Sequence, residues 1–401
     1  MIELRDNVKV KLNKRASVRQ ESKHPWVYDN EIESIDGNYS NGDIVDVVNY
    51  KDKYVGTGFI NDNSKIRVRI ASRNANDLLG PEFFERRIRY SIDYRLNVME
   101  SIDNARLIFG ESDGFSGLTV DKYNRILVTE VLSLALEMRK ETIYESIIKV
   151  LNEYGYEIDG IYEKNDSDLR DKEGLDRYEG FYGKYAVPDY TETIIEENGI
   201  KYIVDFQNGQ KTGFFLDQKY NRLAIRSIAK NKNVLDVCTC TGSFGFNAYA
   251  AGAKKVVSID VSKSSLDLAR RNAMLNGFDI EYVESDAFDY LDSIHKGDFD
   301  FIILDPPAFT KSRNTVKAAA RGYEELNYKA IMKLNRGDYL ATCSCSHFMN
   351  EEMFLDNIKR AAFRAGRELK LVEARKQSKD HPILINVPET DYLKFFIFEV
   401  I

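Results

Sequence analysis

The fold of the chain is decided by residues 233–245, which read NVLDVCTCTGSFG. The apolar run 233–238 has the length of a buried strand. The turn after it leads into GFNAYAAGA, a stretch of small residues that predicts a helix. A buried strand, a short loop and a helix form the first unit of a doubly wound α/β sheet.

The same alternation of strand and helix continues to the end of the chain. We expect further strands in the apolar runs 255–260, 280–286, 299–305, 338–345, 369–377 and 392–400. Helical stretches separate them, and Asn276-Gly277 marks the end of one predicted helix, over 264–277. Continuous apolar strands joined by helices build a parallel sheet that is covered on both faces. Residues 196–401 are therefore predicted to form a seven-stranded Rossmann-like domain.

Two further zones precede this domain. Residues 1–72 alternate polar and apolar residues in short runs broken by Asn, Gly and Asp turns, which predicts a small antiparallel β-barrel. Residues 73–195 mix helical spacing with strand-like runs and predict an α+β middle domain. Its expected elements are helices in 83–99 and 142–155, two strands in 116–132 around a turn at 122–124, and a loop or surface region over 163–180.

Composition excludes several classes of protein. Of the 401 residues, 43% are hydrophobic and 30% are charged, as in an ordinary globular protein. No apolar run approaches the roughly 18 residues of a membrane span, and the N-terminus has no apolar signal segment. Four cysteines in two Cys-x-Cys pairs indicate reduced thiols in the cytoplasm. Zinc is the alternative, but this spacing is unlike that of structural zinc sites, so no metal is expected.

Two local segments are basic, although the net charge is -7. Residues 1–25 contain seven Lys or Arg against three Asp or Glu, and residues 307–323 contain four Lys or Arg and no acid. Basic segments in an acidic chain suit contact with a polyanion on one face. Solvated basic loops would give the same pattern, so charge alone does not decide between the two interpretations.

Acidic residues end the first four predicted strands of the C-terminal sheet: Asp236, Asp260, Asp286 and Asp305. Ligands of such sheets bind beyond the carboxyl ends of the strands, so these acids are predicted to surround a cofactor. Asp260, with Val261 after it, suits the hydroxyls of a ribose, and Asp286 suits an adenine amine. Thr241 and Gly242 let the backbone approach the ligand closely. The loop lacks the full glycine pattern that the pyrophosphate of NAD needs, which favours S-adenosylmethionine over another nucleotide.

Three further motifs resemble those of one family. They are Asp305-Pro-Pro-Ala-Phe309, Thr342-Cys-Ser-Cys-Ser346 and Gly209-Gln-Lys-Thr-Gly-Phe-Phe-Leu-Asp-Gln218. Together they are similar to motifs of the bacterial 23S rRNA methyltransferases that make 5-methylcytosine. The resemblance covers essentially the whole chain. It implies a class I methyltransferase domain, S-adenosylmethionine as cofactor and ribosomal RNA as partner.

The first half of the chain shares the resemblance. Lys23-His-Pro-Trp-Val-Tyr28 makes the predicted barrel similar to the RNA-binding PUA domain of that family, and residues 109–121 resemble its middle domain. The resemblance also implies that residues 211–222 form a hairpin and turn covering the cofactor, with Phe215 and Gln218 near it.

Methylation of carbon 5 of cytosine needs a thiolate, which adds to carbon 6 and makes carbon 5 nucleophilic. Cys343 and Cys345 end a strand predicted beside that of Asp305, and strand alternation points both to the same side. The residues alone do not choose between them, and buried cysteines that act as small hydrophobes would give the same pattern. The resemblance implies Cys345 as the nucleophile. Asp305, or a water that it holds, is then the expected group that holds the base and removes the proton from carbon 5.

A paired base has to leave its helix to reach such a pocket. Phe309 is expected to stack on the base, and three cations beyond it are expected to bind phosphates: Arg313, Lys317 and Arg321. The motif Asp380-His381-Pro382 matches one of the family and implies that His381 lines the base pocket. A core aromatic side chain at position 309 and a structural histidine at position 381 are the alternatives.

Two other functions stay open. A guanine methyltransferase of ribosomal RNA would share the fold and a D-P-P-x-F motif but would need no thiol. A non-catalytic RNA-binding or ribosome-assembly factor would keep the fold without using the cofactor. We expect no membrane contact, and the oligomeric state stays open, with a homodimer as one option.

Overall fold

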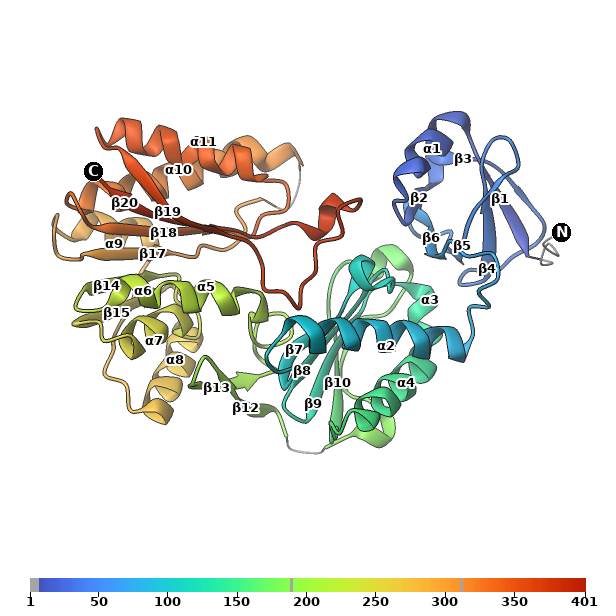
Figure 1. Ribbon diagram of the computed structural model, residues 1–401, viewed down its shortest axis with the longest axis horizontal. Coiled ribbons are helices and arrows are strands. Elements are labelled where there is room, and N and C mark those ends of the chain that lie inside the picture. Colours follow the sequence, from blue (N-terminus) through green and yellow to red (C-terminus); the bar gives the residue numbers. More distant parts are fainter. Residues whose placement is uncertain (1–6, 188–189, 311–312) are drawn as a thin grey trace. The chain divides into compact units, whose positions relative to one another are not determined.

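The computed structural model describes residues 7–187, 190–310 and 313–401, with the backbone alone for Arg313 (Figure 1). The chain divides into two compact units. Unit 1 holds residues 1–193, 204–216 and 379–390, and unit 2 holds residues 194–203, 217–378 and 391–401. The domain boundaries expected at residues 72 and 195 stay predictions. Within the described residues, no helix is both long and apolar enough to cross a membrane.

Unit 2 is built on a seven-stranded sheet in the order β16-β15-β14-β17-β18-β20-β19. Its strands are β14 (Asn233–Val237), β15 (Lys255–Asp260), β16 (Glu281–Glu284), β17 (Phe301–Leu304), β18 (Tyr339–Ser344), β19 (Leu369–Arg375) and β20 (Lys394–Val400). The strands from β16 to β18 pair in parallel, and β20 runs antiparallel between β18 and β19. The predicted seven-stranded sheet is confirmed. β19 and β20 are antiparallel, so they pair without the helical crossover that parallel neighbours need.

Helices cover both faces of this sheet (Figure 1). The helices of unit 2 are α5 (Lys219–Ala224), α6 (Arg226–Ala229), α7 (Ser243–Ala250), α8 (Lys263–Asn276), α9 (Ala287–Ser293), α10 (Val316–Lys333) and α11 (Glu351–Arg364). Figure 1 shows α10 and α11 on one face and α7 and α8 on the other. The predicted helix over 264–277 is therefore confirmed as α8. In a doubly wound sheet, a ligand is expected at the carboxyl ends of the strands.

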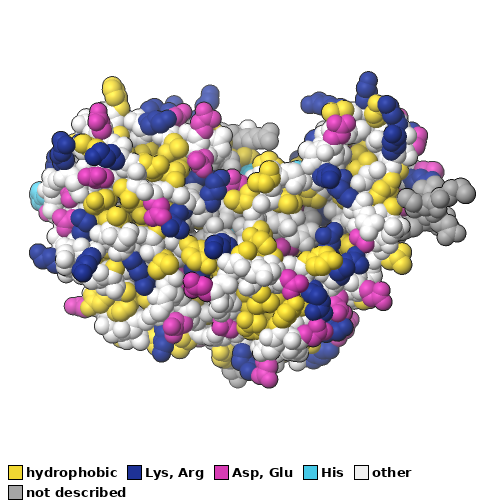
Figure 2. Space-filling model, in the orientation of Figure 1, with side chains coloured by type: hydrophobic (Ala, Val, Ile, Leu, Met, Phe, Trp, Pro, Cys, Tyr) yellow, Lys and Arg dark blue, Asp and Glu magenta, His cyan; other side chains and the backbone are white. Residues whose placement is uncertain are grey.

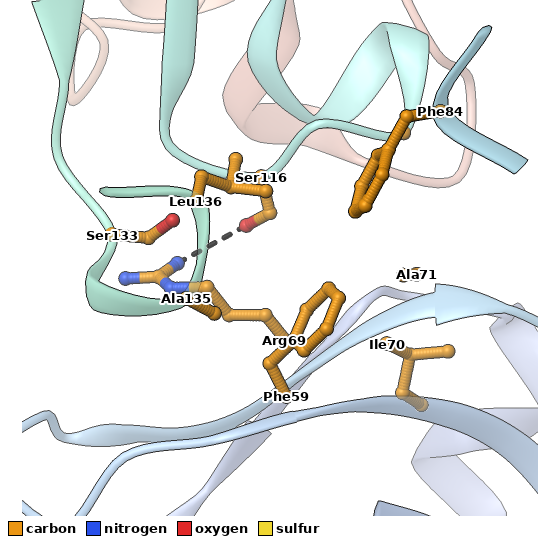
Figure 3. Close-up of a pocket in the computed structure, with 10 residues that line it drawn as sticks. Phe59, Arg69, Ile70, Ala71, Phe84, Ser116, Ser133, Ala135 and Leu136 are labelled. Carbon is orange, nitrogen blue, oxygen red and sulfur yellow. Dashed lines mark hydrogen bonds between the residues drawn. The ribbon is translucent and has the colours of Figure 1, made fainter. Parts of the chain in front are cut away.

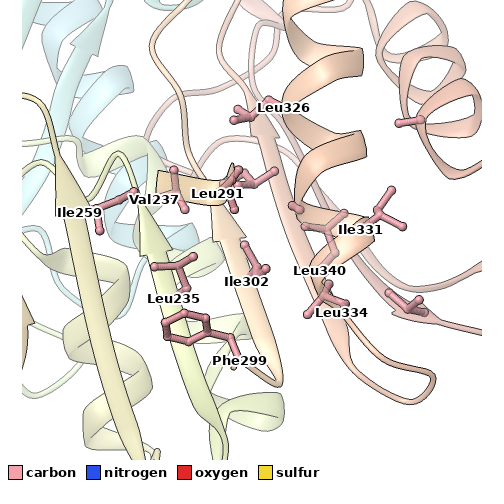
Figure 4. Close-up of a cluster of buried hydrophobic side chains, with 14 of the residues drawn as sticks. Leu235, Val237, Ile259, Leu291, Phe299, Ile302, Leu326, Ile331, Leu334 and Leu340 are labelled. Atoms are coloured by element: carbon pink, nitrogen blue, oxygen red, sulfur yellow. The ribbon is translucent and has the colours of Figure 1, made fainter. Parts of the chain in front are cut away.

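The core between the sheet and α10 consists mainly of aliphatic side chains (Figure 4). Leu235, Ile302 and Leu340 come from neighbouring strands, and Leu326 and Ile331 come from α10. All five are at most 1% exposed. Burying such side chains contributes about 1.5–3 kcal/mol each, so this packing fixes the strands whose carboxyl ends carry the candidate site.

Unit 1 begins with a six-stranded barrel in the order β2-β6-β5-β4-β1-β3. Its elements are β1 (Val8–Leu12), α1 (Lys14–Arg19), β2 (Trp26–Tyr28), β3 (Ile32–Asp36), β4 (Ile44–Val48), β5 (Tyr54–Ile60) and β6 (Ile66–Ser72). The prediction of an all-antiparallel barrel is wrong at one pair, because β1 and β4 are parallel. β3 and β4 flank β1 instead of pairing with each other, and apolar alternation alone does not reveal such a crossing.

The second part of unit 1 has a five-stranded sheet in the order β11-β10-β9-β8-β7. Its elements are α2 (Pro81–Val98), β7 (Asn104–Phe109), β8 (Leu118–Tyr123), β9 (Ile126–Val131), α3 (Leu134–Glu137), α4 (Lys140–Glu153), β10 (Gly160–Asn165) and β11 (Tyr178–Phe181). Both predicted helices are confirmed. β8 continues through Tyr123, so the turn lies at Asn124, where φ is 53°, rather than at 122–124.

The expectation of a loop over residues 163–180 is wrong at both ends, where β10 and β11 lie. The polar sequence hid β10 because the charged side chains of this strand are buried with partners. Lys140 Nζ lies 3.0 Å from Glu163 Oε1, and Lys164 Nζ donates to the carbonyl oxygen of Gln207 at 2.6 Å. Buried charges that are satisfied in this way are compatible with a strand interior.

Contacts between the barrel and the sheet help to make unit 1 compact (Figure 3). Arg69 of β6 donates to Ser116 Oγ at 3.1 Å and pairs with Glu173 Oε1 at 2.7 Å. A small pocket beside Arg69 is lined by Phe59 and Phe84 among others. The largely buried Arg69–Glu173 ion pair would leave an uncompensated charge if the barrel moved away, so it resists separation of the two parts.

Candidate active site

The loop after β14 adopts a backbone that L-residues rarely occupy. Cys238, Cys240 and Gly242 have φ values of 62°, 50° and 86°. A Cβ built at Gly242 would lie 2.6 Å from the ring of Phe246, so only glycine fits there. The loop therefore packs Gly242 directly against the Phe246 ring before α7 begins at Ser243.

Asp236 holds this loop through hydrogen bonds to Thr239 and Gly245. Its side chain is fully buried, and Oδ2 accepts hydrogen bonds from the backbone N–H of Gly245 at 2.9 Å and from Thr239 Oγ1 at 2.5 Å. Burial raises the pKa of the Asp236 carboxyl to about 6. Asp236 thus joins the loop to the first turn of α7. Its contact with a cofactor stays a prediction.

The next two strand ends carry acids that solvent reaches. Asp260 Oδ2 accepts from the Cys240 N–H and Oδ1 from the Ser262 N–H, each at 2.9 Å. Asp286 is exposed, and its side chain caps α9. Val261, beside Asp260, is 64% exposed, whereas Thr241 is buried in the loop. These residues lie at the carboxyl ends of the neighbouring parallel strands β14, β15 and β16.

This donor set fits S-adenosylmethionine. Gly242 holds the loop backbone in a left-handed conformation at the start of α7, where a side chain would meet the Phe246 ring. Each oxygen of Asp260 accepts one backbone hydrogen bond and retains a lone pair for a ribose hydroxyl. Asp286 offers an exposed carboxylate for an amine. Within the described residues, no group of three or more His, Cys, Asp or Glu side chains is placed to hold a metal ion.

Asp305 follows the central strand β17 and is the most strongly perturbed acid of the site. Gln218 Nε2 donates to its Oδ1 at 3.1 Å, and the Cys343 thiol forms a further hydrogen bond with it. Burial, followed by the carboxylates of Asp217 and Asp236, raises the pKa of Asp305 to about 7. A carboxyl group with this pKa exchanges a proton near neutral pH, which suits a general acid or base.

The two cysteines of the Cys-x-Cys pair after residue 342 have different surroundings. Cys343 lies within β18, is 0% exposed, and has a thiol pKa raised well above its ordinary value by burial and then by Asp305. Cys345 follows the last residue of β18 and is partly exposed. Burial and then Asp260 also raise the pKa of Cys238 and Cys240, so three of the four thiols stay protonated at neutral pH.

Phe309, four residues after Asp305 in the chain, packs against α10. The ring of Phe309 packs on Tyr323, with ring centroids 4.6 Å apart, and the hydroxyl groups of Tyr323 and Ser346 lie 2.8 Å apart. Phe309 is partly buried, so it anchors the segment after Asp305. Its expected stacking on a base stays a prediction.

The predicted RNA contacts are distributed over both units. Lys317 and Arg321 are exposed and lie four residues apart on α10, whereas the side chain of Arg313 lies outside the described residues. On the face shown in Figure 2, Lys and Arg side chains are interspersed with Asp and Glu. Their binding to phosphates stays a prediction.

His381 and Phe215 both belong to unit 1. The ring of His381 is 2% exposed, its Nδ1 lies 2.9 Å from Asp380 Oδ1, and Phe109 packs 5.3 Å away, as expected for a structural histidine. Phe215 has the Lys211 ammonium 5.5 Å from its ring centroid. The hairpin expected over 211–222 is wrong, because this segment forms turns and then α5. The expected contacts of His381 with the base and of Phe215 with the cofactor stay predictions.

Sequence reasoning missed Lys394. This residue begins β20, is 3% exposed, and donates through Nζ to the carbonyl oxygens of Ser346 and Tyr392. The available signal was a lysine at the start of the otherwise apolar run KFFIFEV. A lysine at a strand end is ordinarily a solvated residue, so nothing in the pattern marked it.

Comparisons with known proteins agree with this geometry. Residues 10–73 match the model of a PUA-like domain, and residues 185–398 match that of an S-adenosylmethionine-dependent methyltransferase. The ribosomal RNA large subunit methyltransferase I of Shigella dysenteriae is 36% identical over 386 residues, covering 94% of this chain and 95% of the relative. Its counterpart in Escherichia coli O139:H28 is 36% identical over 385 residues, covering 94% and 96%.

Two solved structures show the same fold. A Streptococcus mutans protein assigned as an S-adenosylmethionine-dependent methyltransferase has a TM-score of 0.81 at 21% identity, covering 98% of this chain and 99% of that chain. A structure of SMU.776 complexed with SAH has a TM-score of 0.82 at 21% identity and the same coverage.

Proposed function

Because the chain belongs to the ribosomal RNA large subunit methyltransferase I family, we propose that it methylates carbon 5 of a cytosine in large-subunit ribosomal RNA through Cys345. It is an S-adenosylmethionine-dependent methyltransferase. A ribosomal substrate would place the enzyme in the cytoplasm. The barrel and the exposed Lys317 and Arg321 of α10 would contact RNA phosphates.

Asp260, Asp286 and the backbone at Gly242 would hold the cofactor, which supplies an electrophilic methyl group when bound. The Cys345 thiolate adds to carbon 6 of the cytosine, and the electron pair that this addition places on carbon 5 takes the methyl group. The proton on carbon 5 then leaves to Asp305, or to a water that Asp305 holds. The electron pair of that C–H bond restores the ring double bond and expels the thiolate.

One observation carries this proposal: Asp305 and Cys345 follow neighbouring parallel strands, β17 and β18, beside the predicted cofactor loop. Gln218 orients the Asp305 carboxylate, whose pKa of about 7 lets it accept a proton at neutral pH. Cys343 is the weaker candidate for the nucleophile. Its thiol is fully buried, is held protonated, and is hydrogen-bonded to Asp305.

The test is methyl transfer from labelled S-adenosylmethionine to large-subunit rRNA, with the modified nucleotide located by mass spectrometry. Cys345→Ala is expected to lower the rate at least about a thousandfold, because removing a nucleophile leaves only binding and electrostatic contributions. Calorimetry should still detect cofactor binding to this variant. Cys343→Ser, which keeps a donor for Asp305, is expected to stay within about tenfold of the native rate.

Two results would overturn the proposal. Full activity of Cys345→Ala with the methyl group on a guanine would identify a guanine methyltransferase. Native protein that binds RNA but not S-adenosylmethionine would identify a non-catalytic factor.

A further inference from the structure

Lys394 is a buried lysine at the first position of β20, opposite Ser344 in the antiparallel pair with β18. Its Nζ donates to the carbonyl oxygen of Ser346 at 2.8 Å and to that of Tyr392 at 2.7 Å. An ammonium group has three donors, so these two carbonyls leave one N–H uncommitted. The bond to Ser346 also ties the ammonium to the residue next to Cys345.

The charge of Lys394 lacks the partner that the other strongly buried lysines have. Lys122 pairs with Asp103, and Lys164 lies within ion-pair range of Glu179. Within the part of the chain that the structure describes, no carboxylate lies within 4.0 Å of Lys394 Nζ. Burial accordingly lowers the pKa of Lys394 to about 8. A buried ammonium without a carboxylate is costly unless another anion compensates it.

The nearby carboxylates are engaged elsewhere. Asp391 and Glu351 act on Lys394 only at longer range, and both lie against Lys376, whose Nζ is 2.5 Å from Asp391 Oδ2 and 3.6 Å from Glu351 Oε2. Lys376 therefore neutralises much of their charge. Among the groups that raise the pKa of Lys394 against this burial, Cys345 has the largest effect.

Two other titratable side chains that act on Cys345, Tyr323 and Cys343, do not supply a positive charge. Tyr323 of α10 and Cys343 of β18 are both neutral at pH 7, because burial raises the pKa of each. Asp305, which is hydrogen-bonded to Cys343, would oppose a second negative charge in the site. Lys394 is the cation that acts on Cys345 from β20.

We propose that the Lys394 ammonium is the counter-charge that stabilises the Cys345 thiolate, which makes Lys394 a positioning residue for the attack on the pyrimidine. This inference rests on the proposed role of Cys345. The thiol proton leaves to solvent, and Lys394 keeps its own proton throughout. The thiolate charge is consumed when the sulfur–carbon bond forms and returns when that bond breaks. The ammonium thus lowers the free energy of the resting thiolate and of the departing one.

The experiment follows the alkylation of Cys345 by iodoacetamide between pH 5 and pH 10, with peptide-resolved mass spectrometry separating it from the other three cysteines. Lys394→Met is expected to move the pH midpoint of alkylation upward by about one unit or more and to slow the reaction at pH 7 about tenfold. The two proteins should react at similar rates at pH 10, where both thiols are ionised. Lys394→Arg, which keeps the charge, is expected to stay near the native profile.

Lys122→Met is the matched control, because it removes an equally buried lysine in unit 1 whose pKa is also about 8. It should leave the Cys345 profile unchanged. Lys394→Gln keeps a donor for the Ser346 carbonyl without the charge, so it decides the question if the Met variant does not fold. Calorimetric binding of S-adenosylmethionine reports whether unit 2 is intact.

An unshifted profile in both Lys394→Gln and Lys394→Met would overturn the inference, and so would a shift of equal size in Lys394→Arg. The proposed function fails separately. If Cys345→Ala still methylates RNA while Lys394→Gln shifts the alkylation profile, Lys394 does stabilise the Cys345 thiolate, but Cys345 is not the nucleophile. If Cys345→Ala is inactive and the profile does not shift, only the role of Lys394 is wrong.

Discussion

Burial raises the pKa of both Asp305 and Cys343, but it has different consequences for a carboxyl group and for a thiol. Both lie at or near the end of an apolar strand, where Cys343 is 0% exposed and Asp305 is partly buried. Burial raises the pKa of Asp305 into the neutral range, where a carboxyl group exchanges protons usefully. The same burial raises the pKa of Cys343 well above its ordinary value and leaves it as a hydrogen-bond donor.

Asp305→Asn is expected to stabilise the protein at high pH. The folded pKa of about 7 lies above the unfolded value of ~3.9. The folded state therefore binds more protons between these values, and stability falls as the pH rises through this window. An Asn avoids that loss and can still accept from Gln218. The thermal midpoint of the variant should exceed that of the native protein by about 2–4 °C at pH 8 and by less at pH 5. Equal differences at both pH values, measured by calorimetry, would contradict a raised pKa.

At this scale the sequence identified the acids of the site but not their surroundings. Asp305 and Cys345 could be placed at strand ends from apolar runs alone. That Asp236 points under the loop, and that Cys343 is sealed inside the sheet, depends on packing from α7 and β20 that no local pattern encodes. Lys394 was missed because its burial arises only when β20 inserts beside β18.

Among the elements, the loop from Cys238 to Gly242 combines an unusual backbone with a close contact to α7. Two non-glycine residues of the loop have left-handed φ values, each of which costs about 1–2 kcal/mol. The Asp236 carboxylate repays part of this cost by holding Thr239 and the N–H of Gly245. These bonds hold the loop in one conformation, which suits its predicted contact with the cofactor.

Gly242→Ala is expected to weaken S-adenosylmethionine binding at least about tenfold, because the new methyl group would lie 2.6 Å from Phe246 and must displace the loop. Gly252→Ala is the matched control. It has nearly the same positive φ, 87° against 86°, but its nearest neighbour, Lys230 Cγ, is 3.9 Å away. Both variants should lose stability, and only the first should lose affinity in calorimetry. Unchanged affinity in Gly242→Ala would show that the loop does not contact the cofactor.

Element existence was well predicted where apolar runs were long, as in α2, α8 and the central strands of the seven-stranded sheet. Strand direction was not, because alternation is the same in parallel and antiparallel pairs, which explains the error at β1 and β4. β10 was hidden because Glu163 and Lys164 are buried with partners from distant segments.

At the scale of the molecule, each compact unit is assembled from three segments that are separated in the sequence. Residues 379–390 lie between two strands of unit 2 but cluster with unit 1. Arg95 explains this, because it is fully buried and donates to the carbonyl oxygen of Asp380 at 2.8 Å while pairing with Asp113 at 2.6 Å. No local motif indicates such a long-range contact, and the base contact that the Asp380-His381-Pro382 motif implies for His381 stays a prediction.

The most direct test of the central claim is to trap the bond between Cys345 and the substrate. Large-subunit rRNA carrying 5-fluorocytosine is incubated with the whole chain and S-adenosylmethionine, and the products are digested and sequenced by mass spectrometry. Fluorine cannot leave carbon 5 as a proton does, so the sulfur–carbon bond should persist. We predict an RNA adduct on the peptide that contains Cys345, and none with Cys345→Ala. Methylation of the RNA without any adduct, or an adduct on Cys343, would contradict the account.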